Sequence, residues 1–406
     1  MNKKPIFFSF LVLFVLMLAC ANPLGAPSQP QNVETIVAAT LAALTSTASN
    51  SNGTPAPESS SILPHSLYYL DNDATGLLQI FRLEKDAKTV TQVTFEPVDV
   101  EDYGISPIDG SAAYVVNNQL FTINADGSNR SMIVDGGVLD EINPFVNKIS
   151  NPVWSNDGQT IAFGYKGLNF YSIVSGQYDL LIPYQIEDMG NGFVFPEELI
   201  YPEKFSPDGN KLLLTLGYYE GASAAIYYPN GGTVVRLNGG DRAIICCDIT
   251  QWASDSSAIY SASSTFGMFA AGLWKVDATT GNVSTLFVGD FDTNPVQVAD
   301  APLLAPDGNL YFFYASIPNT GDMVNRPPLQ LVRSAADGVT NRTVLRLEIY
   351  DNMNEHLWSP DGSFVIVATA PTPETYFGGT PVLIYTEVQK GSIGLGRFAI
   401  NMQWGP

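Results

Sequence analysis

Hydrophobic and polar residues alternate with a period of two along most of the chain after about residue 63. This period places successive side chains on opposite faces of an extended strand, so the apolar runs predict short β-strands. The clearest runs are Thr160–Tyr165, Lys211–Leu216, Ala258–Ala262, Leu310–Tyr314 and Phe364–Ala368. The 35 Gly and 27 Pro of the 406 residues suit many short strands joined by turns.

One turn sequence precedes these strands repeatedly. Its clearest copies are Trp154-Ser155-Asn156-Asp157-Gly158, Phe205-Ser206-Pro207-Asp208-Gly209 and Trp358-Ser359-Pro360-Asp361-Gly362. Pro presets the first corner of a type I turn, Asp suits the second, and Gly accepts the positive φ that follows. Counting weaker copies, the Asp stands at positions 109, 157, 208, 255, 307 and 361, in steps of 47 to 54 residues. A period near 50 residues with strand-like alternation indicates a repeated β unit.

The repeated turn resembles that of TolB-like, WD-repeat-like β-propellers, whose blades carry Trp-Ser-Pro-Asp-Gly between their first two strands. The resemblance covers about residues 63–406 and implies an all-β propeller. Six turn copies give six units, and a seventh strand set at Ser66–Asp71, Leu78–Leu83 and Val90–Phe95 lacks its first strand. Pairing the lone C-terminal strand Phe398–Trp404 with Ser66–Leu70 closes the ring and hides free sheet edges. We predict seven blades, with six or eight as alternatives.

The N-terminus has the features of an export signal. A basic start is followed by the apolar run Ile6–Ala19, which is too short to span a bilayer comfortably. Met17-Leu18-Ala19-Cys20 resembles the bacterial lipoprotein processing box, although Met17 and Leu18 depart from its usual residues. The resemblance implies cleavage before Cys20 and acylation of that residue; ordinary cleavage after Ala21 or Ala26 is the alternative.

The predicted organisation therefore has three parts. Residues 1–19 are a lipoprotein signal peptide, residues 20–62 are an acylated Cys20 with a Ser/Thr/Pro/Ala-rich tether, and residues 63–406 are the β-propeller. We expect the protein to be lipid-anchored to a bacterial membrane, in the periplasm or on the cell surface.

Charge limits the kinds of partner. The formal net charge is −21, which argues against a nucleic-acid partner because a polyanion requires a basic surface. We expect a monomer that binds an extracytoplasmic protein, peptide or glycan.

The search for catalytic or metal-binding motifs gives little. Only His65 and His356 are present, and His356 is predicted to be a packed core residue. The sequence contains no G-x-S-x-G, no H-E-x-x-H and no paired-cysteine zinc spacing. Two calcium-like stretches, Asp71–Gly76 and Asp290–Asn294, are better explained as hairpin turns. We predict no enzyme activity and no cofactor; the alternative is a carboxylate-based hydrolase or lyase, with calcium assisting, at the propeller mouth.

Cys246 and Cys247 are adjacent, and such a pair can close a strained disulfide ring. We predict instead one thiol on each side of a strand, both buried and inert.

Loop lengths divide the propeller into two faces. Turns between first and second strands and between third and fourth strands share one face, here called the short-turn face. The other connections share the long-loop face, and they hold the insertions Asp135–Ser150, Ile186–Glu203, Ser263–Gly272, Gly289–Pro302, Ala315–Pro328 and Ala370–Thr380. Variable loops on a rigid scaffold are usual binding sites. The predicted partner-binding residues are Glu187, Asp188, Phe193, Phe195, Glu197, Glu198, Tyr201, Tyr376 and Phe377.

Overall fold

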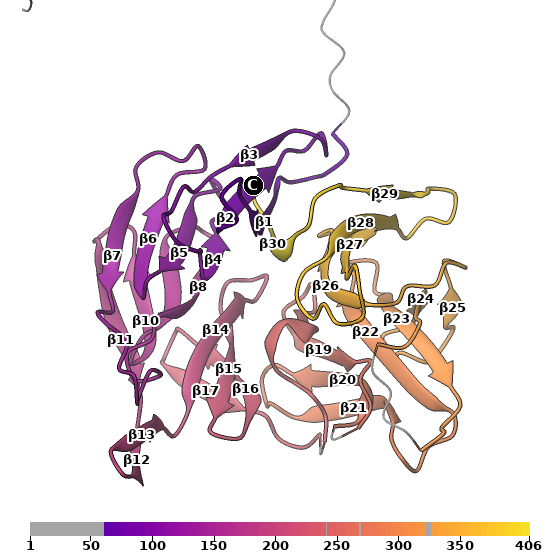
Figure 1. Cartoon of the computed structure of the whole chain (residues 1–406). Coiled ribbons are helices and arrows are strands. Elements are labelled where there is room, and N and C mark those ends of the chain that lie inside the picture. The colour runs from indigo at the N-terminus through magenta and orange to yellow at the C-terminus, as the bar shows by residue number, and fades with distance from the viewer. Residues whose placement is uncertain (1–60, 241, 268, 322–325) are drawn as a thin grey trace, which may run out of the picture. The chain divides into compact units, whose positions relative to one another are not determined.

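The computed structural model describes residues 61–406, except residues 241, 268 and 322–325. The described residues belong to one compact unit. Seven four-stranded antiparallel sheets form a ring, and a separate two-stranded hairpin extends from it (Figure 1). The predicted seven-bladed β-propeller is therefore confirmed. The predicted signal peptide, Cys20 and the tether up to residue 60 lie outside the described residues.

We number the blades from the one that holds both ends of the ring and give the strands of each from the inside outward. Blade 1 contains β30 (Ile400–Trp404), β1 (Leu67–Asn72), β2 (Leu78–Leu83) and β3 (Val90–Gln92). Blade 2 contains β4 (Asp102–Ile105), β5 (Ala112–Val116), β6 (Gln119–Ile123) and β7 (Ser131–Asp135). Blade 3 contains β8 (Ser150–Trp154), β9 (Thr160–Gly164), β10 (Gly167–Ser172) and β11 (Gln177–Pro183), and is followed by the hairpin β12 (Ile186–Gly190) and β13 (Phe193–Pro196).

The remaining blades repeat this order. Blade 4 contains β14 (Leu199–Phe205), β15 (Leu212–Tyr218), β16 (Gly221–Tyr228) and β17 (Thr233–Arg236). Blade 5 follows the 3-10 turn η1 (Cys247–Ile249) and contains β18 (Thr250–Trp252), β19 (Ala258–Ser263), β20 (Ala271–Asp277) and β21 (Val283–Gly289). Blade 6 contains β22 (Val296–Leu304), β23 (Leu310–Ile317), β24 (Gln330–Ser334) and β25 (Thr343–Val344). Blade 7 contains β26 (Met353–Trp358), β27 (Phe364–Thr369), β28 (Thr380–Tyr385) and β29 (Ser392–Gly394).

The repeated turn is held by its serine. Ser359 is fully buried, and its Oγ accepts a hydrogen bond from the backbone N–H of Phe364 at 3.1 Å and donates to the carbonyl of the same residue at 3.0 Å. Ser206 in blade 4 accepts from the N–H of Lys211 in the same way. The glycine that ends the turn has a φ of +72° at Gly362 and also at Gly209, a conformation that favours glycine. The turn sequence therefore fixes how the first strand meets the second.

The repeated tryptophan joins neighbouring blades. The indole Nε1–H of Trp154 donates to the carbonyl of Gly104 on the inner strand of the preceding blade, at 3.1 Å. Equivalent bonds run from Trp252 to Lys204, from Trp358 to Ala301 and from Trp404 to Trp358. A buried carbonyl needs a donor, and the tryptophan supplies one while its ring fills the space between sheets.

The ring closes as predicted. Strand β30 pairs antiparallel with β1, and Leu67 lies opposite Trp404. Further bonds connect β30 to blade 2, because the Gln403 side chain donates to the carbonyl of Tyr103 and accepts from the N–H of Ile105. The first and last strands of the described propeller are thus neighbours, as Figure 1 shows for β1 and β30.

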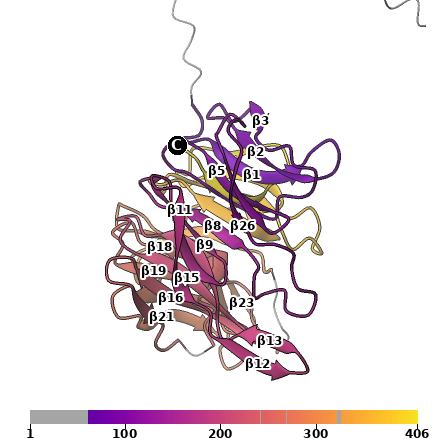
Figure 2. The same ribbon diagram turned by 90° about the vertical axis from the view of Figure 1, so that its left-hand side faces the viewer.

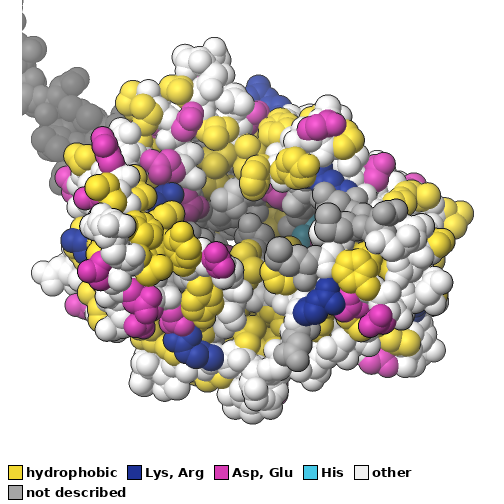
Figure 3. Space-filling model, turned by 60° about the horizontal axis from the view of Figure 1, so that its bottom comes forward, with side chains coloured by type: hydrophobic (Ala, Val, Ile, Leu, Met, Phe, Trp, Pro, Cys, Tyr) yellow, Lys and Arg dark blue, Asp and Glu magenta, His cyan; other side chains and the backbone are white. Residues whose placement is uncertain are grey.

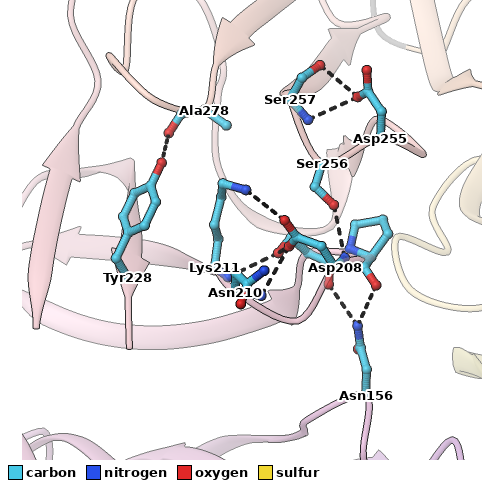
Figure 4. Close-up of polar contacts among 11 residues, drawn as sticks. Asn156, Asp208, Asn210, Lys211, Tyr228, Asp255, Ser256, Ser257 and Ala278 are labelled. Carbon is cyan, nitrogen blue, oxygen red and sulfur yellow. Dashed lines mark hydrogen bonds and ion pairs between the residues drawn. The ribbon is translucent and has the colours of Figure 1, made fainter. Parts of the chain in front are cut away.

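Successive turns on the short-turn face also bond to one another (Figure 4). Asn156 of blade 3 donates to the carbonyl of Ser206 in blade 4, and the N–H of Asp208 donates to Ser256 in blade 5. The hydroxyl of Tyr228 in blade 4 donates to the carbonyl of Ala278 in blade 5 at 2.7 Å. These three contacts hold neighbouring blades together on this face.

Most of the core lies between neighbouring sheets. One buried cluster joins Tyr68 and Ile80 of blade 1 to Tyr103, Tyr114 and Phe121 of blade 2. No helix in the described part of the chain is long and apolar enough to cross a membrane.

Candidate functional site

The two faces differ in what their connections contain. The described chain starts on the short-turn face, where the N–H groups of Ile62 and Leu63 donate to the carbonyl of Lys85 in the β2–β3 turn. Because β1 then runs toward the long-loop face, the long connections lie at the opposite end of the strands from this start. In two views at right angles, the β12–β13 hairpin lies on the far side of the molecule from β3 and the start of the described chain (Figures 1 and 2).

The β12–β13 hairpin projects beyond the blades on the long-loop face (Figure 2). The sequence predicted this region only as a loop, whereas Glu187 pairs with Phe195 and Asp188 with Val194 across the two strands. The Asp188 carboxylate accepts a hydrogen bond from the N–H of Gly190 and so shapes the tip. The outer face of this hairpin is largely exposed, since every residue of β12 is exposed.

Asn143, in the connection between blades 2 and 3, ties a second loop to this hairpin. Its Oδ1 accepts from the N–H of Val194 at 2.7 Å, and its Nδ2 donates to the carbonyl of Gly192 at 3.3 Å. The Asp140 carboxylate accepts from the N–H groups of Ile142 and Asn143 and holds that loop in shape. A polar side chain with both ends bonded fixes the relative positions of the two segments.

Four aromatic rings fill the junction of three connections. They are Phe145, Phe193, Phe195 and Tyr219, and we call them the aromatic cluster. Phe195 lies at the centre, with ring centroids 5.3 Å from Phe145 and 5.7 Å from Tyr219. Phe195 is only 7% exposed, whereas Tyr219 is 62% exposed. The cluster therefore has a buried centre and a solvent-facing rim.

We call the whole assembly the loop cluster: residues 136–149, 184–198 and 219–220. Its exposed apolar side chains are Val138, Ile142, Phe145, Ile186, Met189 and Tyr219. Its exposed acids are Asp140, Glu141, Glu187, Asp188, Glu197 and Glu220, and its one exposed base is Lys148. With the β12–β13 side brought forward, the surface shows acidic side chains among hydrophobic ones around a central hollow (Figure 3). Exposed apolar groups within a rim of one charge are typical of a protein-binding surface.

The structure separates the predicted site residues into three groups. Glu187, Asp188 and Glu197 are exposed and Phe193 is half-buried, so these four lie on the surface of the loop cluster. Phe195 is a packing residue within it. The other four, Glu198, Tyr201, Tyr376 and Phe377, have different roles or positions.

Glu198 forms a two-pronged ion pair with Arg236, and its Oε1 also accepts from Tyr218. The guanidinium of Arg236 lowers the pKa of this carboxyl. Tyr201 was expected in a loop, but it lies within the inner strand β14, half-buried beside Gly217. Burial raises the pKa of its hydroxyl. Both residues therefore make contacts inside blade 4. The expectation that Tyr201 is a loop residue is wrong, because the inner strand β14 already begins at Leu199.

Tyr376 and Phe377 lie in the β27–β28 connection of blade 7, across the ring from the hairpin. Both are exposed, at 61% and 78%. The guanidinium carbon of Arg326 lies 4.7 Å from the centroid of the Tyr376 ring. The Asn354 side chain donates hydrogen bonds to the carbonyls of Thr375 and Gly378, which hold this loop in shape. They form a second aromatic surface on the long-loop face, separate from the loop cluster.

Four carboxylates lie on inner strands, where the enzyme alternative would place its catalytic groups: Asp102, Glu203, Asp300 and Glu355. Asp102 accepts from the N–H of Asn151 in the next blade, and Glu355 accepts from the N–H of Met402. Asp300 accepts from the N–H of Ala301 and from the Ser264 hydroxyl. In these contacts Asp102, Asp300 and Glu355 join inner strands to neighbouring strands and loops. Among the described residues, no three His, Cys, Asp or Glu side chains are grouped as metal ligands.

Two inner-strand groups have strongly shifted pKa values. Burial raises the pKa of Asp300 to about 6, and the hydrogen bonds from Ser264 and Ala301 oppose this only in part. Burial and the positive charge of Lys204 lower the pKa of His356 to about 3, so this imidazole is neutral at pH 7. Neutral His356 cannot act as an acid at neutral pH.

The two calcium-like stretches form turns. The Asp73 carboxylate accepts from the N–H groups of Thr75 and Leu77 in the β1–β2 connection. Asp290 pairs with Arg242 and accepts from the N–H of Phe291. The carboxylates of Asp73 and Asp290 therefore interact with groups of the protein itself.

The prediction for the adjacent cysteines is wrong. Cys246 and Cys247 lie in the connection between β17 and β18, Cys247 is exposed, and the two sulfurs contact each other at 2.7 Å. The left-handed backbone at Cys247, with φ of +62°, turns both side chains to the same side instead of alternating them. The Cys246 sulfur, desolvation and the charge of Glu203 raise the pKa of the Cys247 thiol, so the protonated form is favoured.

Sequence reasoning missed Asn143, Phe145 and Tyr219. Phe145 lies within a loop that was predicted for this face, so its position was available from the sequence. Tyr219 lies in a two-residue connection between β15 and β16, which gave no signal of length. Only the placement of blade 4 beside the hairpin brings its ring to Phe193, at a centroid distance of 6.1 Å.

The fold defines the class of this protein as a seven-bladed β-propeller, and comparison with solved structures agrees. A puromycin-hydrolysing peptidase of Mycobacterium tuberculosis is 13% identical with a TM-score of 0.54, over 83% of this chain and 52% of that chain. An oligogalacturonate lyase solved in complex with manganese is 9% identical with a TM-score of 0.51, over 82% of this chain and 85% of that chain.

A TolB from Agrobacterium tumefaciens is 17% identical with a TM-score of 0.38, over 73% of this chain and 95% of that chain. The β-propeller fold that the repeated turn implied is confirmed by the seven four-stranded sheets of the ring. No family model and no curated protein matches the sequence.

Proposed function

We propose that this protein is an extracytoplasmic, membrane-anchored propeller that binds a protein or peptide partner through the loop cluster. The observation that carries the proposal is the aromatic cluster: three separate connections are bonded together and present apolar side chains within an acidic rim. Aromatic side chains give contact area at low entropic cost, and their pre-ordering reduces the cost of binding.

The charge of the loop cluster defines the chemistry of the partner. Six exposed acids against one exposed base favour a partner segment that carries Lys or Arg beside apolar side chains. Such charges act mainly on the association rate, so binding should weaken as ionic strength increases.

The start of the described chain supports a tethered arrangement. Residues 61–63 lie on the short-turn face, at the opposite end of the strands from the loop cluster. If Cys20 is acylated, the tether therefore enters the propeller through residues at the short-turn face.

The test is capture of extracytoplasmic proteins by the full chain, photo-crosslinked through a probe at position 189. The loop-cluster variant carries Glu187→Lys, Asp188→Lys and Tyr219→Ala. The matched control is Tyr376→Ala with Phe377→Ala, which removes an exposed aromatic pair from the other surface of the same face. The proposal requires a salt-sensitive partner with basic residues that the first variant loses at least about tenfold and the control retains. Equal capture by both variants would contradict the proposal.

The alternative proposal is a carboxylate-based hydrolase or lyase, with calcium assisting, at the propeller mouth, and the inner-strand acids are its basis. Asp102→Asn with Glu355→Gln tests it. Loss of turnover of a polysaccharide or peptide substrate in this variant, with binding at the loop cluster unchanged, would favour the alternative.

A further inference from the structure

The connection between blades 4 and 5 holds Cys246 and Cys247 in an unusual backbone. Cys246 is fully extended, with φ of −163° and ψ of 171°, and Cys247 then enters the left-handed region. Side chains of adjacent residues in a strand point to opposite sides, so this change of conformation is what brings the two sulfurs together.

Neighbouring groups hold that conformation from both sides. The N–H of Cys247 donates to Thr215 Oγ1 of blade 4 at 2.9 Å. The carbonyl of Cys247 accepts from the hydroxyl and from the N–H of Thr250 at the start of β18. Two blades therefore fix the residue whose left-handed backbone places the thiols in contact.

The pair is also accessible. Cys247 is exposed and Cys246 is half-buried, so a reagent in solution reaches them from the long-loop face. An exposed thiol in an oxidising compartment forms a disulfide with whichever thiol is nearest, and here that is its own neighbour.

We propose that Cys246 and Cys247 are a covalent modification site, oxidised after export to a disulfide between adjacent residues. The proposal rests on the extracytoplasmic location of the proposed function. This disulfide would close a small ring that includes the peptide bond between the two residues. It would remove the exposed thiol and fix the conformation of the connection that leads into blade 5.

The reaction is a thiol–disulfide exchange with a disulfide oxidant, such as a disulfide-bearing oxidoreductase. One thiol first loses its proton to solvent, and the resulting thiolate attacks the oxidant disulfide to form a mixed disulfide while one oxidant thiol leaves. The second cysteine then displaces the other oxidant thiol. Two protein thiols lose two protons and two electrons, and the oxidant becomes a dithiol.

Peptide mapping tests the modification on the full chain in isolated membranes. Free thiols are alkylated in whole cells before the membranes are isolated, and trypsin then releases Ala243–Lys275, which contains both cysteines and no internal Lys or Arg. We expect this peptide to carry no alkyl group and to be lighter than its dithiol form by two hydrogens. After reduction it should take up two alkyl groups.

Three results of the peptide mapping would overturn the proposal. A peptide alkylated at both cysteines without reduction would overturn the proposal, and so would a stable mixed disulfide or a cross-link to another chain. The variants Cys246→Ser and Cys247→Ser provide matched controls, because each leaves one thiol that must become alkylated or pair elsewhere. Partner capture is measured separately, so failure of the disulfide and failure of the binding function give different results.

Discussion

The short-turn face and the long-loop face are built from the same strands but use polar residues differently. On the short-turn face, the turn serines Ser155, Ser206 and Ser359 each accept a hydrogen bond from the backbone N–H five residues later, so the same contact recurs in blades 3, 4 and 7. On the long-loop face, Asn143 bonds to the β12–β13 hairpin, a two-stranded sheet that stands outside the repeated four-stranded blades. Repetition marks the groups that hold the scaffold, and departure from repetition marks the surface on which a specific partner can be recognised.

The comparison also explains why one face tolerates insertions. Closing a longer loop costs little additional free energy, about 0.6 kcal/mol for each doubling of its length. The turns that contain the buried serines Ser206 and Ser359 cannot be lengthened in this way, because each serine hydroxyl accepts a hydrogen bond from a backbone N–H of the sheet. We therefore expect stability to depend on the short-turn face and the inner strands, and binding to depend on the loop cluster.

Removal of residues 397–406 should have the largest effect. The deletion removes β30, opens the edges of β1 and its neighbours, and deletes Trp404, which donates to the carbonyl of Trp358. Trp404 is half-buried and β30 pairs along β1, so loss of the strand should cost several kcal/mol and lower Tm by roughly 5 °C or more. Calorimetry measures this, and an unchanged Tm would refute closure of the ring through the shared blade.

Trp358→Phe should have the next largest effect. Phe keeps an aromatic ring but removes the Nε1–H that donates to the buried carbonyl of Ala301 at 3.0 Å. An unpaired buried acceptor costs about 1–3 kcal/mol. Chemical denaturation should show this loss, whereas Phe377→Ala, at a side chain 78% exposed, should change stability by less than about 0.5 kcal/mol.

Asp300→Asn should stabilise the protein at pH 7. Burial raises the folded-state pKa of Asp300 to about 6, above the unfolded value, so the ionised carboxylate is unfavourable in the fold. Asn keeps the acceptor for the N–H of Ala301 without the charge, and we expect a gain of about 1–2 kcal/mol at pH 7.

The gain should disappear between pH 6 and pH 4. Over that range Asp300 takes up its proton in the folded protein before it does so in the unfolded chain, which stabilises the wild type as the pH falls. Denaturation of both proteins at pH 4 and pH 7 measures the difference. A gain that persists unchanged at pH 4 would show that charge is not its cause.

Tyr219→Ser should have the smallest effect on stability and a large effect on binding. The ring is 62% exposed and packs against Phe193 and Phe195 at the rim of the aromatic cluster. We expect a stability change within about 0.5–1 kcal/mol and clearly weaker partner capture. Phe195→Ala provides the contrast: because this ring is 7% exposed, its loss should lower stability by about 3–5 kcal/mol. If the two variants unfolded alike, the distinction between rim and centre would fail.

The sequence by itself determined the strands, the number of blades and the closure of the ring. Those features rest on local causes: a period of two sets the strands, and Ser, Asp and Gly set a turn within five residues. The repeat of Trp358-Ser359-Pro360-Asp361-Gly362 around the chain then allowed blades to be counted, and the unpaired strand Phe398–Trp404 indicated how the ring ends meet.

Only the tertiary structure decided which residues form the loop cluster. Tyr219 and Phe145 are 74 residues apart, and their contact with Phe195 depends on how blades 2, 3 and 4 stand side by side. The pairing of Glu198 with Arg236 depends on the sheet of blade 4, and the meeting of the two adjacent cysteine sulfurs depends on the left-handed backbone at Cys247. Such contacts follow from positions fixed by ring closure and by one left-handed residue, and no local period or turn motif in the sequence encodes them.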